Sequence, residues 1–397
     1  MLMKTRVILI AIIIVVCSKA FAYDFSAVCE SGQTLYYNIT SSAEPYTVEV
    51  TFENSSGYII NPTGNLIIPS SVIYEGLSYS VTRIGHHSFY YCSEILSVTI
   101  PNSVLTIAAS AFNGCVGLTS ITIPNSVKII EYESFYGCTG MTSVTIGNSV
   151  TNIGSRAFYN CSGLTLMSIP NSVLIIGYDV FYGTGWYNNQ EDGILYLDGW
   201  CLGYKGDEPI GNLTIIENTI GIAENAFNNC TGLSSLIFPN SITIICCSAF
   251  CGCTSIDTIY SNAQNPPQIC DDSFFYVLHN IPVIVPCGSV SAYDNAELWS
   301  DFTNIQDDCS GIEKTEIADI QIFPNPTNNI LNITSPEKIS EIEIVNVTGQ
   351  VVYRTDVNGN NAVCDVEGLA NGVYVVLVRT LSGAEGANVV QKKFIKE

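Results

Sequence analysis

The chain has 397 residues, and its 36 acidic against 14 basic residues give it a net charge of −22. Such an acidic surface repels the phosphate groups of nucleic acids and anionic lipid headgroups, so we expect no nucleic-acid partner. Hydrophobic residues make up 47% of the chain and charged residues only 13%, so Ser, Thr, Asn and Gly must supply most of the polar surface. This length allows two or three domains.

The first segment, residues 1–22, has the pattern of a secretory signal peptide. Basic residues precede an apolar run of ten residues, Val7–Val16, and Ala20-Phe21-Ala22 gives the small-x-small pattern of a cleavage site. Cys17 would suggest a lipoprotein, but a valine precedes it where a small residue is expected. The apolar run is too short to cross a bilayer, so we expect a mature chain that begins near Tyr23 and has no membrane span.

Residues 23–64 contain two segments in which apolar and polar residues alternate, Thr34–Ile39 and Tyr46–Phe52. Alternation of this kind predicts a β-hairpin. Because the end of a repeat array must be covered, we expect this hairpin to form an N-terminal β cap over the repeats that follow.

A spacing of 23 residues organises residues 65–255 into repeats. Six cysteines follow it with gaps of 23, 23, 23, 69 and 23 residues, and 69 is three periods. These cysteines are Cys92, Cys115, Cys138, Cys161, Cys230 and Cys253. Seven phenylalanines keep the same spacing: Phe89, Phe112, Phe135, Phe158, Phe181, Phe227 and Phe250.

The best-preserved unit, Leu118–Cys138, explains the spacing physically. Apolar residues at Leu118, Ile121 and Ile123 predict a short half-buried strand, which Pro124 ends. A second extended segment follows, and a compact turn closes the unit. One unit cannot bury its own apolar face, but stacked units share a continuous core, so the repeats predict a solenoid.

Residues 183–209 interrupt the repeats. Two apolar runs joined near Asp198-Gly199 predict a β-hairpin that projects from the solenoid. The insertion carries five notable aromatic residues: Trp186, Tyr187, Tyr196, Trp200 and Tyr204. Two interpretations stay open, because such rings are typical binding anchors but are also typical of a small cluster that pins a hairpin onto the array.

Beyond the repeats the composition changes. We expect residues 256–305 to form the C-terminal cap of the solenoid and the polar residues 306–318 to form a linker. Residues 319–397 hold short β-type runs separated by turns, which predicts a small antiparallel β-sandwich. The predicted fold class is therefore mainly β with short helical turns, a solenoid followed by a sandwich.

The repeat resembles the BspA-like (Treponema-type) leucine-rich repeat, on the residues Leu118-Thr-Ser-Ile-Thr-Ile-Pro124 and Tyr136-Gly-Cys138. Residues 319–397 resemble a type IX secretion sorting domain, on Phe323-Pro-Asn-Pro-Thr327, Leu369-Ala-Asn-Gly-Val-Tyr374 and Lys392-Lys-Phe-Ile-Lys396. The first resemblance implies adhesion to host matrix proteins or to neighbouring cells. The second implies that the type IX secretion machinery carries the chain across the outer membrane, so that it is secreted or held at the cell surface.

Cysteine chemistry has three possible forms here: disulfides, a metal site, or a buried core. We expect the six ladder cysteines to be buried thiols, because aligned side chains of adjacent rungs point in parallel. Cys246, Cys247 and Cys251 crowd near Cys253, but they lack the paired C-x₂-C spacing of zinc sites. We therefore predict no metal, and a local disulfide involving Cys247 and Cys251 stays open.

Catalytic motifs are missing from the sequence. The three histidines, His86, His87 and His279, have no accompanying nucleophile motif, and no metalloprotease or phosphate-loop motif occurs. We therefore expect neither an enzyme nor a cofactor.

The remaining candidates are surfaces. Thr99, Thr122, Thr145, Ser97 and Ser120 predict a polar ladder of hydroxyl groups, for which solubility is a sufficient explanation. One turn position changes residue at every rung: His87, Ser110, Glu133, Arg156, Asp179, Asn225 and Ser248. These turn residues and the aromatic insertion are the predicted binding surface, and a protein is the expected partner. A glycan-binding module and a structural surface-layer component without a dedicated ligand stay open as alternatives.

Overall fold

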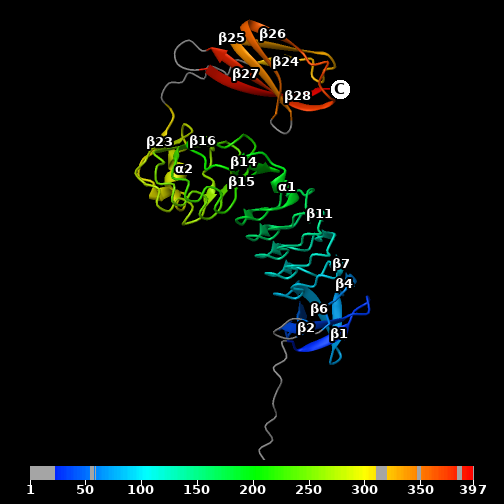
Figure 1. Ribbon diagram of the computed structural model, residues 1–397. Helices are drawn as coiled ribbons and strands as arrows, with labels where there is room; N and C mark the ends of the chain where they lie inside the picture. Colours follow the sequence, from blue (N-terminus) through cyan, green and yellow to red (C-terminus); the bar gives the residue numbers. More distant parts are fainter. Residues whose placement is uncertain are drawn as a thin grey trace, which may run out of the picture. The chain divides into compact units, whose positions relative to one another are not determined.

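The computed structural model describes residues 23–53, 58, 60–309, 320–346, 350–381 and 387–396. The predicted signal peptide and most of the predicted linker lie outside these described residues. The chain divides into two compact units, Met1–Asp308 and Cys309–Glu397 (Figure 1). Within the described residues, no helix is long and apolar enough to cross a membrane.

The N-terminal strands form the first layer of the solenoid. Strands β1 (Phe25–Val28), β2 (Thr34–Ser41) and β3 (Thr47–Thr51) pair antiparallel, so the predicted hairpin is β2–β3. Strand β3 then pairs in parallel with β6 (Leu77–Ile84), which also pairs antiparallel with β5 (Ser71–Tyr74) and in parallel with the next repeat strand. The hairpin therefore continues directly into the repeat sheet.

The repeats build two rows of short parallel strands. The first row is β4 (Gly64–Ile67), β7 (Ile95–Thr99), β9 (Ser120–Thr122) and β11 (Ser143–Thr145), and later β16 (Gly211–Thr214), β18 (Leu233–Phe238), β20 (Thr258–Ser261), β22 (Val283–Val285) and β23 (Ile305–Asp307). The second row is β6, β8 (Thr106–Ile107), β10 (Ile129–Ile130), β12 (Asn152–Ile153) and β13 (Ile175–Ile176), and later β15 (Trp200–Lys205), β17 (Gly221–Ile222), β19 (Ile244–Ile245) and β21 (Gln268–Ile269). The register follows the 23-residue period, since Ile130 pairs with Ile153 and Ile121 with Val144.

The core is an aromatic ladder, which we define as the seven in-phase phenylalanines. Rings of Phe112, Phe135 and Phe158 stack nearly parallel, with centroids 5.3 and 5.2 Å apart. Four of the six ladder thiols donate to a backbone oxygen of the preceding rung, as Cys138 Sγ does to Phe112 O at 3.1 Å. All six ladder cysteines are free and buried, so the predicted thiol ladder is confirmed.

Cys247 forms a disulfide, with a partner other than the one left open in the sequence analysis. Cys247 bonds Cys270, with Cα atoms 5.0 Å apart, and Cys251 is a free thiol. The pairing of Cys247 with Cys251, which the sequence left open, is therefore excluded. Equivalent positions of adjacent rungs, 23 residues apart, bring the two Cα atoms within the range that a disulfide spans.

The insertion forms helix α1 (Gly185–Asn188) and strands β14 (Gly193–Leu197) and β15, which pair antiparallel. Asp198 and Gly199 both have positive φ, at 47° and 81°, which is the two-residue hairpin turn that these residue types favour. The hairpin does not project, however. Because β15 pairs in parallel with β17, it takes the place of a rung in the second row.

Two further structures complete the chain. Helix α2 (Val290–Asp294) and the 3-10 helix η1 (Trp299–Asp301) cover the last rung, where buried Trp299 packs 5.7 Å from Phe274. The C-terminal unit is an antiparallel sheet of β24 (Gln321–Phe323), β25 (Ile330–Asn346), β26 (Val351–Asp365), β27 (Gly372–Leu381) and β28 (Ala387–Lys396) around its own core. The predicted fold class is confirmed in both units.

Candidate binding cleft

The variable turn position has a fixed backbone conformation. All seven of its residues have φ between 53° and 57°, in the left-handed region that side chains other than Gly, Asn and Asp rarely adopt. The hydrogen-bonded rungs around the turn hold this conformation, for example through Arg156 N donating to Tyr178 O at 2.9 Å. The side chain at this position is thus free to vary while its backbone is not.

Three consecutive members of this position form a charged cluster. Arg156 lies between Glu133 and Asp179, with its nitrogens 4.0 and 3.9 Å from their carboxylate oxygens. Its guanidinium carbon is 5.0 Å from the ring centre of Tyr178 and 5.5 Å from that of Tyr159. This surface therefore already binds a cation of the chain itself, through aromatic faces and flanking carboxylates.

A row of tyrosines runs beside this cluster. The rings of Tyr136 and Tyr159 stack with centroids 5.1 Å apart, and so do those of Tyr159 and Tyr182. Tyr187 from α1 extends the row, 4.8 Å from Tyr182. The row therefore leads from the regular repeats into the insertion.

The aromatic ladder breaks where the insertion begins. Phe181 stacks on Phe158 at 5.9 Å, but on its other side it meets the edge of Trp186 at 6.3 Å. The ladder resumes when Tyr204 stacks on Phe227 at 6.3 Å. Trp186 and Tyr204 thus cover the two ends that the break leaves.

The backbone ladder breaks at the same place. Phe158 N donates to Val180 O, and Phe227 N donates to Ala249 O, each between adjacent rungs. No corresponding bond joins the Phe181 and Phe227 turns within the part of the chain that the structure describes. The break opens a cleft of about 530 Å³.

The cleft combines aromatic walls with a few polar groups. Its aromatic lining is Tyr178, Phe181, Tyr182, Trp186, Tyr187 and Tyr204. Its polar side chains are Asp179, Glu224 and Asn225. Burial raises the pKa of the Asp179 carboxyl, and the positive charge of Arg156 opposes this shift.

Glu224 joins the two sides of the break. Its backbone nitrogen donates to Ile176 O at 2.9 Å, and its Oε2 accepts from Ser155 Oγ at 2.7 Å and from Tyr178 N at 3.2 Å. Glu131 does the same in the regular repeats, where its Oε2 accepts from Ala109 N at 2.9 Å. Glu224 is thus a structural carboxylate that holds one edge of the cleft closed.

Seven of the predicted binding residues fall into three groups. Asp179, Trp186, Tyr187 and Tyr204 line the cleft, and Glu133 and Arg156 lie beside it. His87 lies two rungs before Glu133, where its ring is tilted against the rings of His86 and Tyr90, with ring centroids 3.7 and 4.7 Å apart.

Two of the predicted aromatic anchors pack within the protein and are not available to a ligand. Trp200 is only 1% exposed and packs in the core, so a ligand cannot reach it without unfolding, and it must be removed from the predicted surface. Tyr196 is half-buried, and its hydroxyl accepts from Ile216 N at 3.4 Å. For these two rings the pinning interpretation holds.

Sequence reasoning missed Tyr178, Tyr182 and Glu224, and it named Asn225 as a variable turn residue without placing it beside the insertion. A signal existed, because Phe181 and Phe227 are 46 residues apart, which is two periods. That spacing indicates that the inserted segment replaces one rung and brings the flanking turns together.

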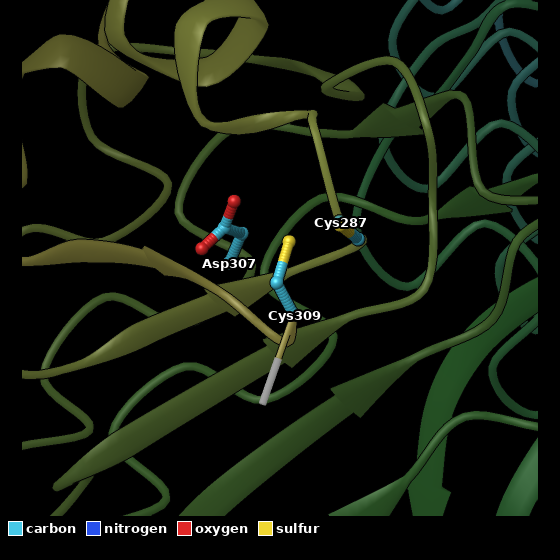
Figure 2. A group of neighbouring side chains, drawn as sticks. All are labelled: Cys287, Asp307 and Cys309. Carbon is cyan, nitrogen blue, oxygen red and sulfur yellow. The ribbon is translucent and has the colours of Figure 1, made fainter. Parts of the chain in front are cut away.

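Figure 2 shows Cys287, Asp307 and Cys309 as neighbours, and their potential ligand atoms all lie within 4.8 Å of one another. Both cysteines are disulfide-bonded. A disulfide offers no thiolate to a metal, and a single carboxylate does not make a zinc site. We therefore assign the two cysteines a structural role in disulfides and propose no metal site here.

Comparisons with known proteins agree with this architecture. A family model described as the BspA type leucine rich repeat region matches residues 71–188 and 204–306 in six copies. A second, the secretion system C-terminal sorting domain, matches residues 321–397. No curated protein matches the chain.

Solved structures of bacterial leucine-rich repeat proteins are similar at low identity. The T. pallidum protein TpLRR is 18% identical, over 67% of this chain and 90% of its own, with a TM-score of 0.32. A Bacteroides ovatus leucine-rich repeat protein is 20% identical, over 72% and 88%, with a TM-score of 0.34. The pneumococcal vaccine antigen PcpA is 16% identical, over 71% and 98%, with a TM-score of 0.31.

Proposed function

We propose, from the premise that this chain belongs to the BspA-type leucine-rich repeat family, that it binds another protein at the cleft where its repeats are interrupted. The family model covers more than half of the chain. The C-terminal sorting domain makes it an exported protein of the outer membrane or cell surface. Its partner is then a protein of the host matrix or of a neighbouring cell, and its role is adhesion.

The observation that carries this proposal is the convergence of aromatic and charged side chains at one opening. Trp, Tyr and Arg are the residues that dominate the energetics of protein interfaces. Here Trp186, Tyr187 and Tyr204 line the cleft, and Arg156 lies at its edge beside Asp179. The regular rungs, by contrast, bury their aromatic ladder completely.

A binding role also fits the chemistry of the thiols. Leucine-rich repeat proteins of this type are typically non-enzymatic. Burial raises the pKa of the Cys92 thiol to about 12 and that of Cys253 to about 12, so both remain protonated at neutral pH. Protonated, buried thiols are poor nucleophiles, which supports the proposal that the chain does not act through cysteine catalysis.

The test is capture of surface proteins by the immobilised, exported chain, followed by affinity measurement on each captured protein. A variant with Trp186→Ala, Tyr187→Ala and Tyr204→Ala should bind at least tenfold more weakly. The matched control, Thr122→Ala with Thr145→Ala, changes the exposed hydroxyl ladder and should bind normally. Circular dichroism must show that the triple variant is folded. Unchanged affinity of a folded triple variant would remove the cleft from the function.

A second candidate function is glycan binding, which a separate pocket of about 360 Å³ favours. Its lining includes the amide side chains of Asn240, Asn262 and Gln264 beside Tyr260, which is 42% exposed. Planar amides that donate and accept, next to an exposed ring, suit a sugar. A glycan array probed with the wild type and with Tyr260→Ala tests this candidate, and no wild-type binding above background would reject it.

A further inference from the structure

The cleft has the form of a missing step in a stack of flat rings. Along the regular repeats the ladder rings follow one another at 5.1 to 5.9 Å. At the break, Trp186 and Tyr204 end the two half-stacks, and both line the opening. A flat group of a partner would therefore meet aromatic surface on entering.

The Asp179 carboxylate in the cleft favours a positively charged group. The Asp179 side chain is 44% exposed, and its one ion-pair partner among the described residues, Arg156, lies 3.9 Å away, beyond hydrogen-bond distance. No side-chain hydrogen bond of Asp179 occurs within the described part of the chain. Its carboxylate therefore keeps its acceptor capacity for an incoming donor.

The chain's own cations show which groups these rings accept. Arg156 lies over Tyr159 and Tyr178, and Lys205 lies 5.5 Å from the ring centre of Tyr187. Lys205 is also held by the backbone oxygens of Asn188 and Gln190, so it is fixed in place. Trp186 and Tyr204 have no such cation of their own among the described residues.

We propose that the cleft receives an arginine side chain of the partner protein, with its guanidinium against Trp186 and Tyr204 and paired with Asp179. This rests on the proposed protein-binding function and names the group that is bound. Arginine fits better than lysine because its guanidinium is planar, stacks on aromatic faces and donates two parallel hydrogen bonds to one carboxylate. The net charge of −22 also attracts a basic partner segment.

The test uses three short glycine-flanked peptides that differ at one residue: arginine, lysine or citrulline, the neutral analogue of arginine. Trp186 is the least buried of the chain's three tryptophans, so its fluorescence reports occupancy of the cleft. We expect the arginine peptide to bind at least tenfold more tightly than the citrulline peptide and more tightly than the lysine peptide. Equal binding of either analogue would overturn the proposal.

A pair of variants separates the cleft from the general acidity of the surface. Asp179→Asn should weaken the arginine peptide about tenfold, whereas Asp257→Asn, which changes an exposed aspartate outside the cleft, should leave its affinity unchanged. Equal losses in both variants would show non-specific attraction and reject the site.

The two levels of the proposal fail differently. If the triple aromatic variant loses the captured partner but the arginine peptide does not bind, only the guanidinium assignment falls. If partner binding ignores the triple variant, the cleft falls as the binding site, whatever the peptides do.

Discussion

The rungs from Phe112 to Cys161 each pack between two regular rungs. At the insertion, residues 183–209, the flanking rungs lack a regular rung on one side. In the regular rungs each ring has a ring on both sides, and each turn donates to the next, as Phe135 N does to Ala157 O at 2.8 Å. At the insertion, Phe181 and Phe227 each lose one of these neighbours to a substitute from the inserted segment. In the regular rungs both faces of each ring pack against other rings and stabilise the fold. At the interruption, aromatic and charged groups stay accessible to a ligand.

The largest effect should come from truncating a ring with neighbours on both sides. Phe135 is fully buried between Phe112 and Phe158, so Phe135→Ala should lower the free energy of unfolding by about 3–5 kcal/mol. Tyr204→Ala should cost less than half of this, because one side of that ring faces the cleft. Urea unfolding of both variants checks the comparison, and equal losses would mean that the cleft is packed like the core.

The next largest effect should come from the disulfide between neighbouring rungs. Cys247 and Cys270 are 23 residues apart, and opening a loop of this size should cost about 3 kcal/mol in the double variant Cys247→Ala, Cys270→Ala. Thermal unfolding of the double variant and of the wild type, both without reductant, measures the loss. Reductant alone does not isolate this bond, because Cys287 and Cys309 are also disulfide-bonded. A double variant as stable as the wild type would contradict the predicted contribution. The ladder variant Cys115→Ala serves as the control, since its unfolding should show the same reductant response as the wild type.

The ladder and the Cys247–Cys270 disulfide also show what could be predicted from the sequence. The ladder was predictable because the same residue types recur every 23 positions, and each position has one environment. The partner of Cys247 was missed because Cys270 lies in the segment predicted as the C-terminal cap, where the repeat pattern is weaker in the sequence, although the two cysteines are one period apart. The burial of Trp200 was not predictable, because alternation within β15 does not tell that β17, a distant segment, covers it.

A smaller loss of stability should come from Glu224, which joins neighbouring turns at the cleft as Glu131 does in the regular repeats. Glu224→Ala removes the acceptor of Ser155 Oγ and Tyr178 N and should cost about 1.5–3 kcal/mol, because both are hydrogen bonds to a charged group. Glu131→Ala is the matched change in the regular repeats. Hydrogen exchange should show faster opening of the Tyr178 amide in Glu224→Ala but not in Glu131→Ala. Protection of that amide in both variants would mean that the edge of the cleft does not depend on Glu224.

The smallest effect should come from Asp179, which lines the cleft and has Arg156 beside it. Folding raises the pKa of this carboxyl, chiefly through burial, so the folded chain holds the proton more tightly than the unfolded chain. This group therefore favours folding below its unfolded-state pKa, and that contribution is lost as the pH rises through the folded-state pKa. Asp179→Asn, which mimics the protonated form, should then stabilise the fold at neutral pH by no more than about 0.5 kcal/mol, because the side chain is 44% exposed and solvent screens its charge. The gain should disappear in acid, where the wild-type carboxyl is itself protonated. Unfolding curves at neutral and acidic pH measure the difference, and a variant less stable at neutral pH would mean that pairing with Arg156 outweighs burial.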